Sequence, residues 1–219
     1  MKTILCYGDS NTWGFNYETL ERFPYGVRWP NVMQKILGDN FRVIEEGLNG
    51  RTTALDDPND DCPEARNGLK YLNPCIRSHY PIDLMIFMLG TNDLKADLFT
   101  TVDDIARNME RLIELSRKEL DARQGYEPKI LLAAPTAIGT SIERSMFCNE
   151  FNGKKSIPLS AELEETLFKT SERLFCYFLN AGEITKPNEV DAIHFNREGH
   201  RLFGEAAAQK VREIFAQSF

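Results

Sequence analysis

The sequence predicts an α/β fold in which a mostly parallel, five-stranded sheet is covered by helices on both faces. Short apolar segments recur along the chain, and amphipathic segments with recognisable helix ends lie between them. Alternation of this kind favours parallel strands joined by right-handed crossovers. A length of 219 residues with 42% hydrophobic residues can fill a substantial core. We therefore expect one domain over residues 1–219.

The predicted strands are apolar runs long enough to cross a buried sheet. They cover residues 3–7, 41–45, 82–89, 129–134 and, with a weaker pattern, 175–180. Parallel sheets of this type keep their binding sites beyond the carboxyl ends of the strands. Polar residues that directly follow the first and third strands are therefore expected at one edge.

Two helices are predicted in the first half of the chain from their end signals. The first covers residues 30–37, with a proline in its first turn and Gly38 directly after its end. The second covers 102–122 and follows a capping pair formed by Thr101 and Asp104. Its inward face is predicted to carry Ile105, Met109, Leu112 and Ile113.

Two more helices are predicted near the end of the chain, where Ser160 and Asn196 are suitable caps. Their inward faces are predicted to carry Leu163, Leu167 and Leu174, and Leu202, Phe203, Ala206, Val211 and Ile214. Segments 54–68 and 138–158 are predicted to be long loops. Long loops in a compact domain often shape a binding site.

The formal net charge of −7 argues against a nucleic-acid-binding protein, which needs a basic face. No apolar stretch reaches the roughly 20 residues of a membrane helix, and the first apolar segment is too short for a signal peptide. We expect a cytoplasmic protein without membrane or nucleic-acid partners. A leader removed from a secreted form would leave no trace in this sequence.

No metal or other cofactor is expected. The five cysteines are scattered without a CxxC pair, so reduced structural thiols are predicted. They are Cys6, Cys62, Cys75, Cys148 and Cys176. The acidic segment "DDPNDD" does not fit a calcium loop, since Cys62 stands where glycine is needed and Gly68 where glutamate is needed.

Ser10 is the serine best placed to act as a nucleophile. It follows the first strand in "GDSNTWG" and begins the next helix, whose positive end suits an anion. Taken alone, the Gly-Asp-Ser stretch is better explained as a turn with a helix cap. There is no GxSxG pentapeptide, so a nucleophile elbow is not predicted.

His194 is the candidate base, because Asp191 precedes it by three residues and can fold back onto the imidazole. The simpler interpretation is a turn-forming aspartate next to a half-buried histidine. His79 precedes a strand at its amino end, and His200 lies within the last predicted helix. Both are predicted to be structural.

Two further residues could donate hydrogen bonds to an oxyanion. Asn92 follows the third strand and has a side-chain NH₂, and Gly50 follows the second and has a backbone N–H. Each also has a structural explanation, as a helix cap and a turn glycine respectively. A serine, a glycine, an asparagine and a histidine all placed beyond strands or in the last loop are harder to explain separately.

Four segments resemble, in order, the sequence blocks of the GDSL-type or SGNH esterases and lipases. They are "GDSNTWG", "GLNGRTT", "GTND" and "DAIHF", and the resemblance extends from residue 5 to 195. It implies a three-layer, flavodoxin-like fold, with Ser10 as nucleophile, His194 as base and Asp191 orienting it. It also implies an oxyanion hole formed by the Ser10 and Gly50 N–H groups and the Asn92 side chain.

The segments "RWPNVMQKILG", "VIEEGLNGRTT" followed by "DDP", and "LGTNDLK" are most similar to small bacterial arylesterases and acyltransferases. This resemblance implies homo-oligomers with narrow hydrophobic acyl pockets and therefore short acyl chains. Trp13 is equally well placed for the core. Candidate substrate contacts beside the blocks are Asn11, Trp13, Thr91, Lys95 and Phe195.

We therefore predict a serine hydrolase that cleaves short-chain esters of small molecules through an acyl-enzyme, which water or another alcohol releases. A carbohydrate O-deacetylase is an alternative, because the same residues would serve acetylated sugars. A non-catalytic binding module on the same fold is a third hypothesis. Such a module would have little reason to keep Ser10, Asn92, Asp191 and His194 together.

Overall fold

The computed structural model describes residues 1–216, and its centre is a parallel five-stranded sheet in the order β4-β1-β5-β6-β7. The strands are β1 (Lys2–Gly8), β4 (Phe41–Gly47), β5 (Leu84–Met88), β6 (Lys129–Ala134) and β7 (Tyr177–Asn180). The predicted α/β class and the five strands are confirmed, with ends shifted by a few residues.

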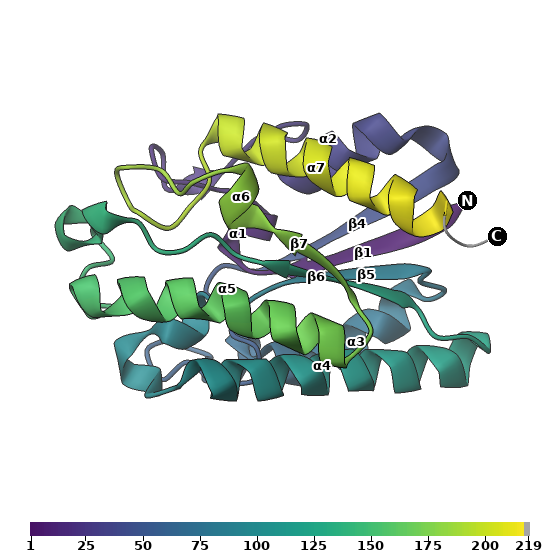
Figure 1. Cartoon of the computed structure of the whole chain (residues 1–219), viewed down its shortest axis with the longest axis horizontal. Coiled ribbons are helices and arrows are strands. Elements are labelled where there is room, and N and C mark those ends of the chain that lie inside the picture. The colour runs from purple at the N-terminus through teal and green to yellow at the C-terminus, as the bar shows by residue number, and fades with distance from the viewer. Residues whose placement is uncertain (217–219) are drawn as a thin grey trace.

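Helices form a layer on each face of this sheet (Figure 1). On one face lie α2 (Trp29–Leu37) and α7 (Arg197–Ala216), which contact each other. On the other lie α3 (Gly68–His79), α4 (Val102–Gln124) and α5 (Ser156–Arg173). This is the three-layer arrangement that the family resemblance implies.

The side chains of β1 show how the sheet separates two cores. Ile4 and Cys6 belong to the core beneath α2 and α7, whereas Leu5 and Tyr7 belong to the core beneath α3, α4 and α5. Alternate residues of a strand point to opposite faces, so a strand buried on both sides must be apolar throughout.

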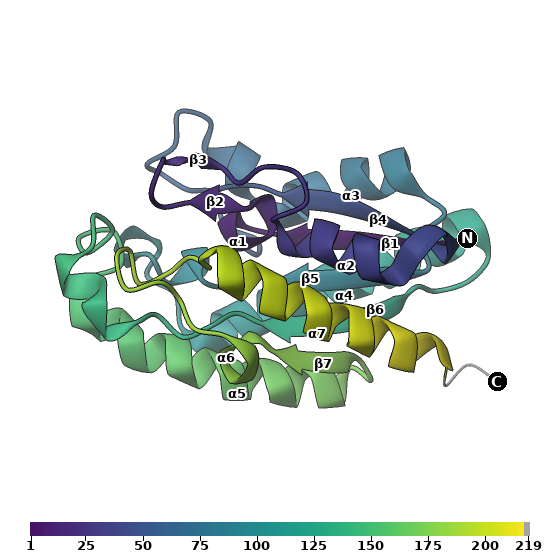
Figure 2. The same cartoon turned by 90° about the horizontal axis from the view of Figure 1, so that it is seen from above.

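Shorter elements lie at and around the carboxyl edge of the sheet, as the view from above shows (Figure 2). They include the helices α1 (Ser10–Trp13) and α6 (Ala181–Ile184) and a hairpin of β2 (Phe15–Asn16) with β3 (Glu21–Arg22). Short 3-10 turns cover Gly38–Asn40, Pro63–Arg66, Asn92–Leu94, Ala96–Leu98, Thr140–Arg144 and Gly153–Lys155. Within residues 1–216, no helix is both long and apolar enough to cross a membrane.

The predicted helix ends are confirmed at several positions. Thr101 and Asp104 form a reciprocal capping box at the start of α4, and Asn196 accepts a hydrogen bond from the Gly199 N–H at the start of α7. Gly38 follows α2 as expected.

The prediction for Ser160 is wrong, because α5 begins at Ser156. The Ser160 hydroxyl lies inside the helix, where it donates to the Ile157 carbonyl and accepts from the Ile138 N–H. It thereby ties the long 138–158 segment to α5. Among the predicted inward residues, Leu174, Leu202 and Ala206 are only half-buried.

Helix α3 was not predicted, because Pro74 interrupts its sequence and proline disfavours a helix interior. The helix forms nevertheless. Asn67 caps its first turn by accepting from the Lys70 N–H, and Leu72 and Ile76 are fully buried against the sheet. Here tertiary packing outweighs local propensity.

Candidate active site

The stretch Gly8-Asp9-Ser10 forms a tight junction between β1 and α1. Asp9 caps the short helix by accepting a hydrogen bond of 2.9 Å from the Asn11 N–H. Gly8 leaves no room for a side chain, since an added Cβ would lie 2.1 Å from the Thr12 hydroxyl. The expected turn and cap are therefore present, and they place the Ser10 side chain at the carboxyl edge of the sheet.

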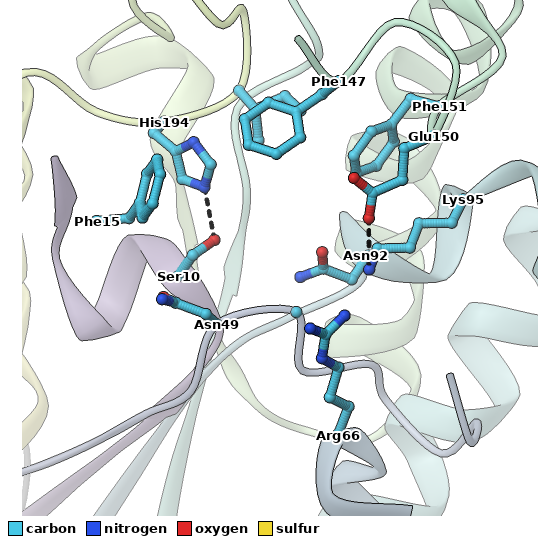
Figure 3. Close-up of a pocket in the computed structure, with 12 residues that line it drawn as sticks. Ser10, Phe15, Asn49, Arg66, Asn92, Lys95, Phe147, Glu150, Phe151 and His194 are labelled. Atoms are coloured by element: carbon cyan, nitrogen blue, oxygen red, sulfur yellow. Dashed lines mark hydrogen bonds and ion pairs between the residues drawn. The ribbon is translucent and has the colours of Figure 1, made fainter. Parts of the chain in front are cut away.

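Three buried side chains form a continuous hydrogen-bonded chain at this edge. The Ser10 Oγ lies 2.7 Å from His194 Nε2, and His194 Nδ1 lies 2.8 Å from Asp191 Oδ2. Figure 3 shows the His194 ring directed at the Ser10 hydroxyl. The structure thus brings together residues 184 positions apart in the sequence.

The Asp191 carboxylate is held ionised by the backbone around it. Burial raises its pKa, but hydrogen bonds from His194 and from the N–H groups of Ile193 and His194 outweigh that effect and lower the pKa below its usual value. The Asn188 amide donates a further hydrogen bond of 2.7 Å. The carboxylate is thus fixed in place and ready to stabilise an imidazolium at His194.

Asn11 holds the loop that carries His194. Its side-chain oxygen accepts from the Phe195 N–H at 2.8 Å, and its amide donates to the Ile193 carbonyl at 3.4 Å. The side-chain oxygen and nitrogen of Asn11 thus each bond to the backbone of a residue next to His194. The predicted substrate contact at Asn11 is corrected, because this side chain binds the protein backbone.

Gly50 and Asn92 lie in the same cavity as Ser10. Gly50 has a positive φ of 76°, which side chains rarely tolerate, and Asn92 donates one amide N–H to the Arg51 carbonyl at 3.1 Å. The residue before the 3-10 turn at Asn92–Leu94 is Thr91, so Asn92 does not have the predicted alternative role of helix cap. Its amide still has a second N–H.

Two buried aspartates support these loops. Asp93 accepts hydrogen bonds from the Thr53 backbone and hydroxyl, joining the loops after β4 and β5. Burial raises the pKa of Asp9 and of Asp93 to about 6, with hydrogen bonds offsetting part of the effect. Both carboxylates serve the loop geometry.

A cavity of about 180 Å³ opens above Ser10, and its two sides differ in chemistry. Phe15 and Phe147 flank His194, with ring centroids 4.5 and 5.6 Å from the imidazole. Beyond Asn92, the opposite side carries Arg66, Lys95 and Glu150 (Figure 3). The acyl pocket expected to be hydrophobic therefore has one charged wall.

A family model described as the GDSL-like Lipase/Acylhydrolase family matches residues 6–202. The chain belongs to this family. It is accordingly a carboxylic ester hydrolase, and the hypothesis of a non-catalytic binding module is not supported.

Solved structures of similar proteins cover nearly the whole chain. Est24, a carbohydrate acetylesterase from Sinorhizobium meliloti, is 35% identical, with a TM-score of 0.89 over 98% of this chain and 100% of that one. The native M. smegmatis aryl esterase is 37% identical, with a TM-score of 0.89 over 97% of this chain and 99% of that one. The fold of this esterase is therefore shared with both.

A curated relative is much longer than this chain. The acetylxylan esterase of Xylanibacter ruminicola is 24% identical over 227 residues, which is 95% of this chain but only 43% of that protein. The chain thus spans less than half the length of that relative.

The predicted substrate contacts are mostly corrected. Lys95 does line the cavity, but Phe195 is fully buried against Phe203, and Thr91 is buried outside the cavity lining. The Arg22 guanidinium carbon lies over the Trp13 ring, 5.3 Å from the ring centroid. Trp13 does not line the cavity. Of these residues, Thr91 and Phe195 are buried, whereas Trp13 is half-buried.

Sequence reasoning missed most of the cavity wall. Phe147, Glu150 and Phe151 come from the 138–158 segment, whose length suggested a site-shaping loop without indicating which residues it contributes. Phe15 comes from the β2–β3 hairpin, and Arg66 from the 3-10 turn before α3. A Phe-x-x-x-Phe spacing at 147 and 151 was the one available signal.

The two other histidines do not line this cavity, and their structural role stays a prediction. His200 is buried, its Nδ1 faces the Trp29 N–H at 3.4 Å, and burial lowers its pKa to about 3. His79 lies at the end of α3 and contacts Glu46 at 2.6 Å.

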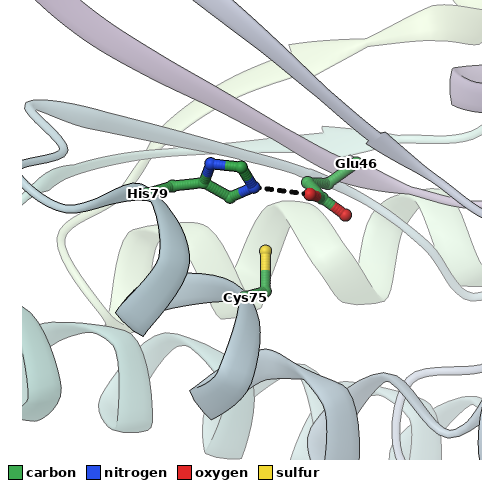
Figure 4. A group of neighbouring side chains, drawn as sticks. All are labelled: Glu46, Cys75 and His79. Atoms are coloured by element: carbon green, nitrogen blue, oxygen red, sulfur yellow. Dashed lines mark hydrogen bonds and ion pairs between the residues drawn. The ribbon is translucent and has the colours of Figure 1, made fainter.

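The contact of His79 belongs to a cluster with Glu46 and Cys75 (Figure 4). Ligand atoms of the three residues lie within 4.8 Å of one another. Binding Zn²⁺ here would require Cys75 to lose its proton, and burial opposes that loss by raising the thiol pKa. The hydrogen bond between His79 and Glu46 satisfies both groups without an ion.

Proposed function

We propose that the chain hydrolyses short-chain acyl esters through a covalent acyl-enzyme. Ser10 is the nucleophile, His194 the general base and Asp191 the residue that orients it. The observation that carries this proposal is the unbroken chain of hydrogen bonds of 2.7 and 2.8 Å through these three side chains.

The hydrogen bond to Asp191 favours the histidine tautomer with its proton on Nδ1, which leaves Nε2 free to accept the Ser10 proton. As Oγ bonds to the ester carbonyl carbon, the proton moves to His194 and the carboxylate stabilises the resulting imidazolium. His194 then returns the proton to the leaving alcohol. Water attacks the acyl-enzyme by the same steps, and another alcohol in its place would give acyl transfer.

The negative charge of the tetrahedral intermediate develops on the former carbonyl oxygen. We assign its donors to the Ser10 N–H at the start of α1, the Gly50 N–H and the second N–H of Asn92. These groups surround one end of the cavity and belong to three different loops. Fixed donors need no rearrangement as the charge appears.

We place the two remaining substituents of the intermediate by the same reasoning. The leaving oxygen must lie within reach of His194, so the alcohol lies beside Phe15 and Phe147 and can be aryl or alkyl. The acyl group then extends away from His194, past Asn92 toward Lys95. The small cavity of about 180 Å³ favours short acyl groups.

Labelling with a serine-directed organophosphonate tests the nucleophile. We expect one label per chain, located by peptide mapping at Ser10, and loss of nearly all turnover in Ser10→Ala and His194→Ala, by roughly 10³-fold or more. Ser78→Ala is the matched control, because Ser78 is exposed on α3, and it should retain full activity. A label on another serine, or an active Ser10→Ala enzyme, contradicts the assignment.

A panel of p-nitrophenyl esters with increasing acyl length tests the substrate class. We expect kcat/KM to be highest for acetate or propionate and to fall steeply beyond butyrate. A maximum at eight carbons or more would refute a short-chain acyl site.

A carbohydrate O-deacetylase is the second candidate, since acetyl is a short acyl group and two similar proteins carry acetylesterase names. Release of acetate from acetylated xylan, compared with release from aryl acetates, separates the two functions. A cytoplasmic location and assembly into a homo-oligomer stay predictions from the sequence.

A further inference from the structure

The charged wall of the cavity is organised around Lys95. Its ammonium lies 2.7 Å from the Asp57 carboxylate and 2.7 Å from the Glu150 carboxylate. The side chains of Lys95 and Asp57 are 4% and 1% exposed, whereas that of Glu150 is 38% exposed. Of the three, Glu150 is therefore the group that a ligand in the cavity meets most directly.

Among the charged groups in this wall and directly behind it, carboxylates outnumber cations, since Glu150, Asp57 and Asp60 pair with Lys95 and Arg66. Arg66, the other cation that lines the cavity, is paired with Asp57 at 2.7 Å and with Asp60 at 2.6 Å. Burial raises the pKa of Asp57, but hydrogen bonds from Lys95, Asn59 and Arg66 outweigh it, so this carboxyl stays ionised. Both cations are thus already neutralised by protein carboxylates.

The backbone holds Glu150 in this position. The Ala96 N–H donates to the Glu150 carbonyl at 2.9 Å, and the neighbouring Phe151 is buried in the core. The 138–158 segment is therefore attached to the segment after β5 at the point where Glu150 meets Lys95. A side chain on an anchored loop is a better specificity determinant than one on a free loop.

We infer that Glu150 is a specificity-determining residue that excludes anionic acyl groups and restricts the enzyme to neutral ones. The inference rests on the proposed function, because the acyl group reaches this wall only if Ser10 and His194 act as assigned. A carboxylate at the end of a four-carbon acyl group would lie beside Glu150, in a site where each cation that the described residues contribute to the lining is already paired with two carboxylates. Like charges brought together in a partly buried site repel strongly.

The test compares two ethyl esters of similar length. Monoethyl succinate ends in a carboxylate, and ethyl levulinate has a neutral acetyl group in its place. Hydrolysis of each is followed by pH-stat titration, and kcat/KM is determined for wild type and Glu150→Gln. We expect the succinate-to-levulinate ratio to rise by about tenfold or more in the variant, because glutamine keeps the shape and removes the charge.

For a cationic acyl ester, ethyl 4-(trimethylammonio)butyrate, we expect Glu150→Gln to change the relative kcat/KM in the opposite direction. Its kcat/KM relative to ethyl levulinate should fall in Glu150→Gln. Opposite changes for the anionic and cationic esters are expected from charge alone, whereas a change in cavity size moves both ratios the same way.

Glu143→Gln is the matched control, since Glu143 lies in the same segment but pairs with Lys154 and does not line the cavity. Its ratios should equal those of wild type. Unchanged ratios in Glu150→Gln, or parallel changes for the two charged esters, overturn the inference. Failure of the wild-type enzyme to hydrolyse ethyl levulinate would instead contradict the proposed function. If Glu150→Gln folds poorly, the kcat/KM of each charged ester relative to ethyl levulinate is determined for Glu150→Ser instead, with the same expected directions.

Discussion

The two sides of the cavity are built in different ways. On one side, Ser10 begins the short helix α1 directly after β1, and His194 lies in the connection of residues 185–196 between α6 and α7, where its contact with Asp191 spans only three positions. On the other side, Lys95 meets Asp57 and Glu150, which come from two long loops. The proposed reacting groups are thus positioned by the end of β1 and by a loop that Asn11 ties to it, whereas the groups that face the proposed acyl substituent depend on loops without such a tie to the nucleophile.

This difference predicts separable effects of substitution. Changes on the first side should reduce turnover for every ester, because they act on the reacting atoms. Changes on the second side should alter which ester is preferred, as proposed for Glu150.

Asn92 lies between the two sides and gives the largest expected effect among the tests of this comparison. If it donates to the oxyanion, Asn92→Ala should lower kcat by roughly 10²–10³-fold for all esters, with a much smaller change in KM. Steady-state kinetics on two esters measures both parameters. Asn59→Ala is the control, because Asn59 is exposed and bonds only within the outer loops. A loss confined to one ester would move Asn92 to the substrate-selecting side.

Asn92→Asp is a less clean test than alanine. An aspartate would lose the amide donor to the Arg51 carbonyl and place a carboxylate near it. Its thermal midpoint must therefore be compared with that of Asn92→Ala before its activity is interpreted.

His200 is expected to affect the free energy of unfolding without taking part in catalysis. Its pKa is about 3 in the fold against 6.5 when exposed, so below pH 6.5 the unfolded chain binds a proton that the folded chain does not. Stability should therefore fall with decreasing pH by about 1 kcal/mol per unit between pH 6.5 and 3 through this group. Urea unfolding of wild type and His200→Gln at several pH values measures the difference.

The variant keeps an acceptor for the Trp29 N–H but cannot titrate, so its stability should depend less on pH. The raised pKa values of Asp9 and Asp93 act in the opposite direction, lowering stability as pH rises from about 4 to 6, and they are present in both proteins. Parallel pH profiles for the two proteins would contradict the assignment to His200.

The smallest expected effect is that of a chelator. The nucleophile and base of the proposed mechanism are both side chains, so EDTA should leave kcat/KM within about twofold. EDTA would remove an ion bound at the Glu46–Cys75–His79 cluster, so the measurement also tests whether such an ion affects turnover. His79→Gln should likewise retain turnover, and marked inactivation by either change would link that cluster to the site.

Sequence patterns predicted the strands and the contact between Asp191 and His194 because both depend on local order. An apolar run that ends in Gly8-Asp9-Ser10 specifies a strand followed by a tight turn, since Gly8 has no space for a Cβ and Asp9 caps the helix. The three-residue spacing of Asp191 and His194 likewise permits their contact in one turn of chain. Patterns of this kind carry information within a few residues.

Other features were decided by packing between distant segments. Helix α3 forms around Pro74 because its apolar face is buried, and Phe195 turns away from the cavity because the core beneath α7 accommodates its ring. Ser160 lies inside α5, and its hydroxyl accepts a hydrogen bond from the N–H of Ile138, 22 positions earlier in the chain. Local propensity contains none of this information, because each outcome depends on contacts with another element.

By itself, the sequence determined the α/β class, the place of Ser10 directly after the first strand and the family to which the chain belongs. Only the tertiary structure decided which side chains face the acyl group. Lys95 and Glu150 are 55 positions apart, and their contact exists because the 138–158 segment is anchored over the end of β5. The buried Lys95 ammonium is paired with the carboxylates of Asp57 and Glu150, and that pairing is a property of the assembled fold.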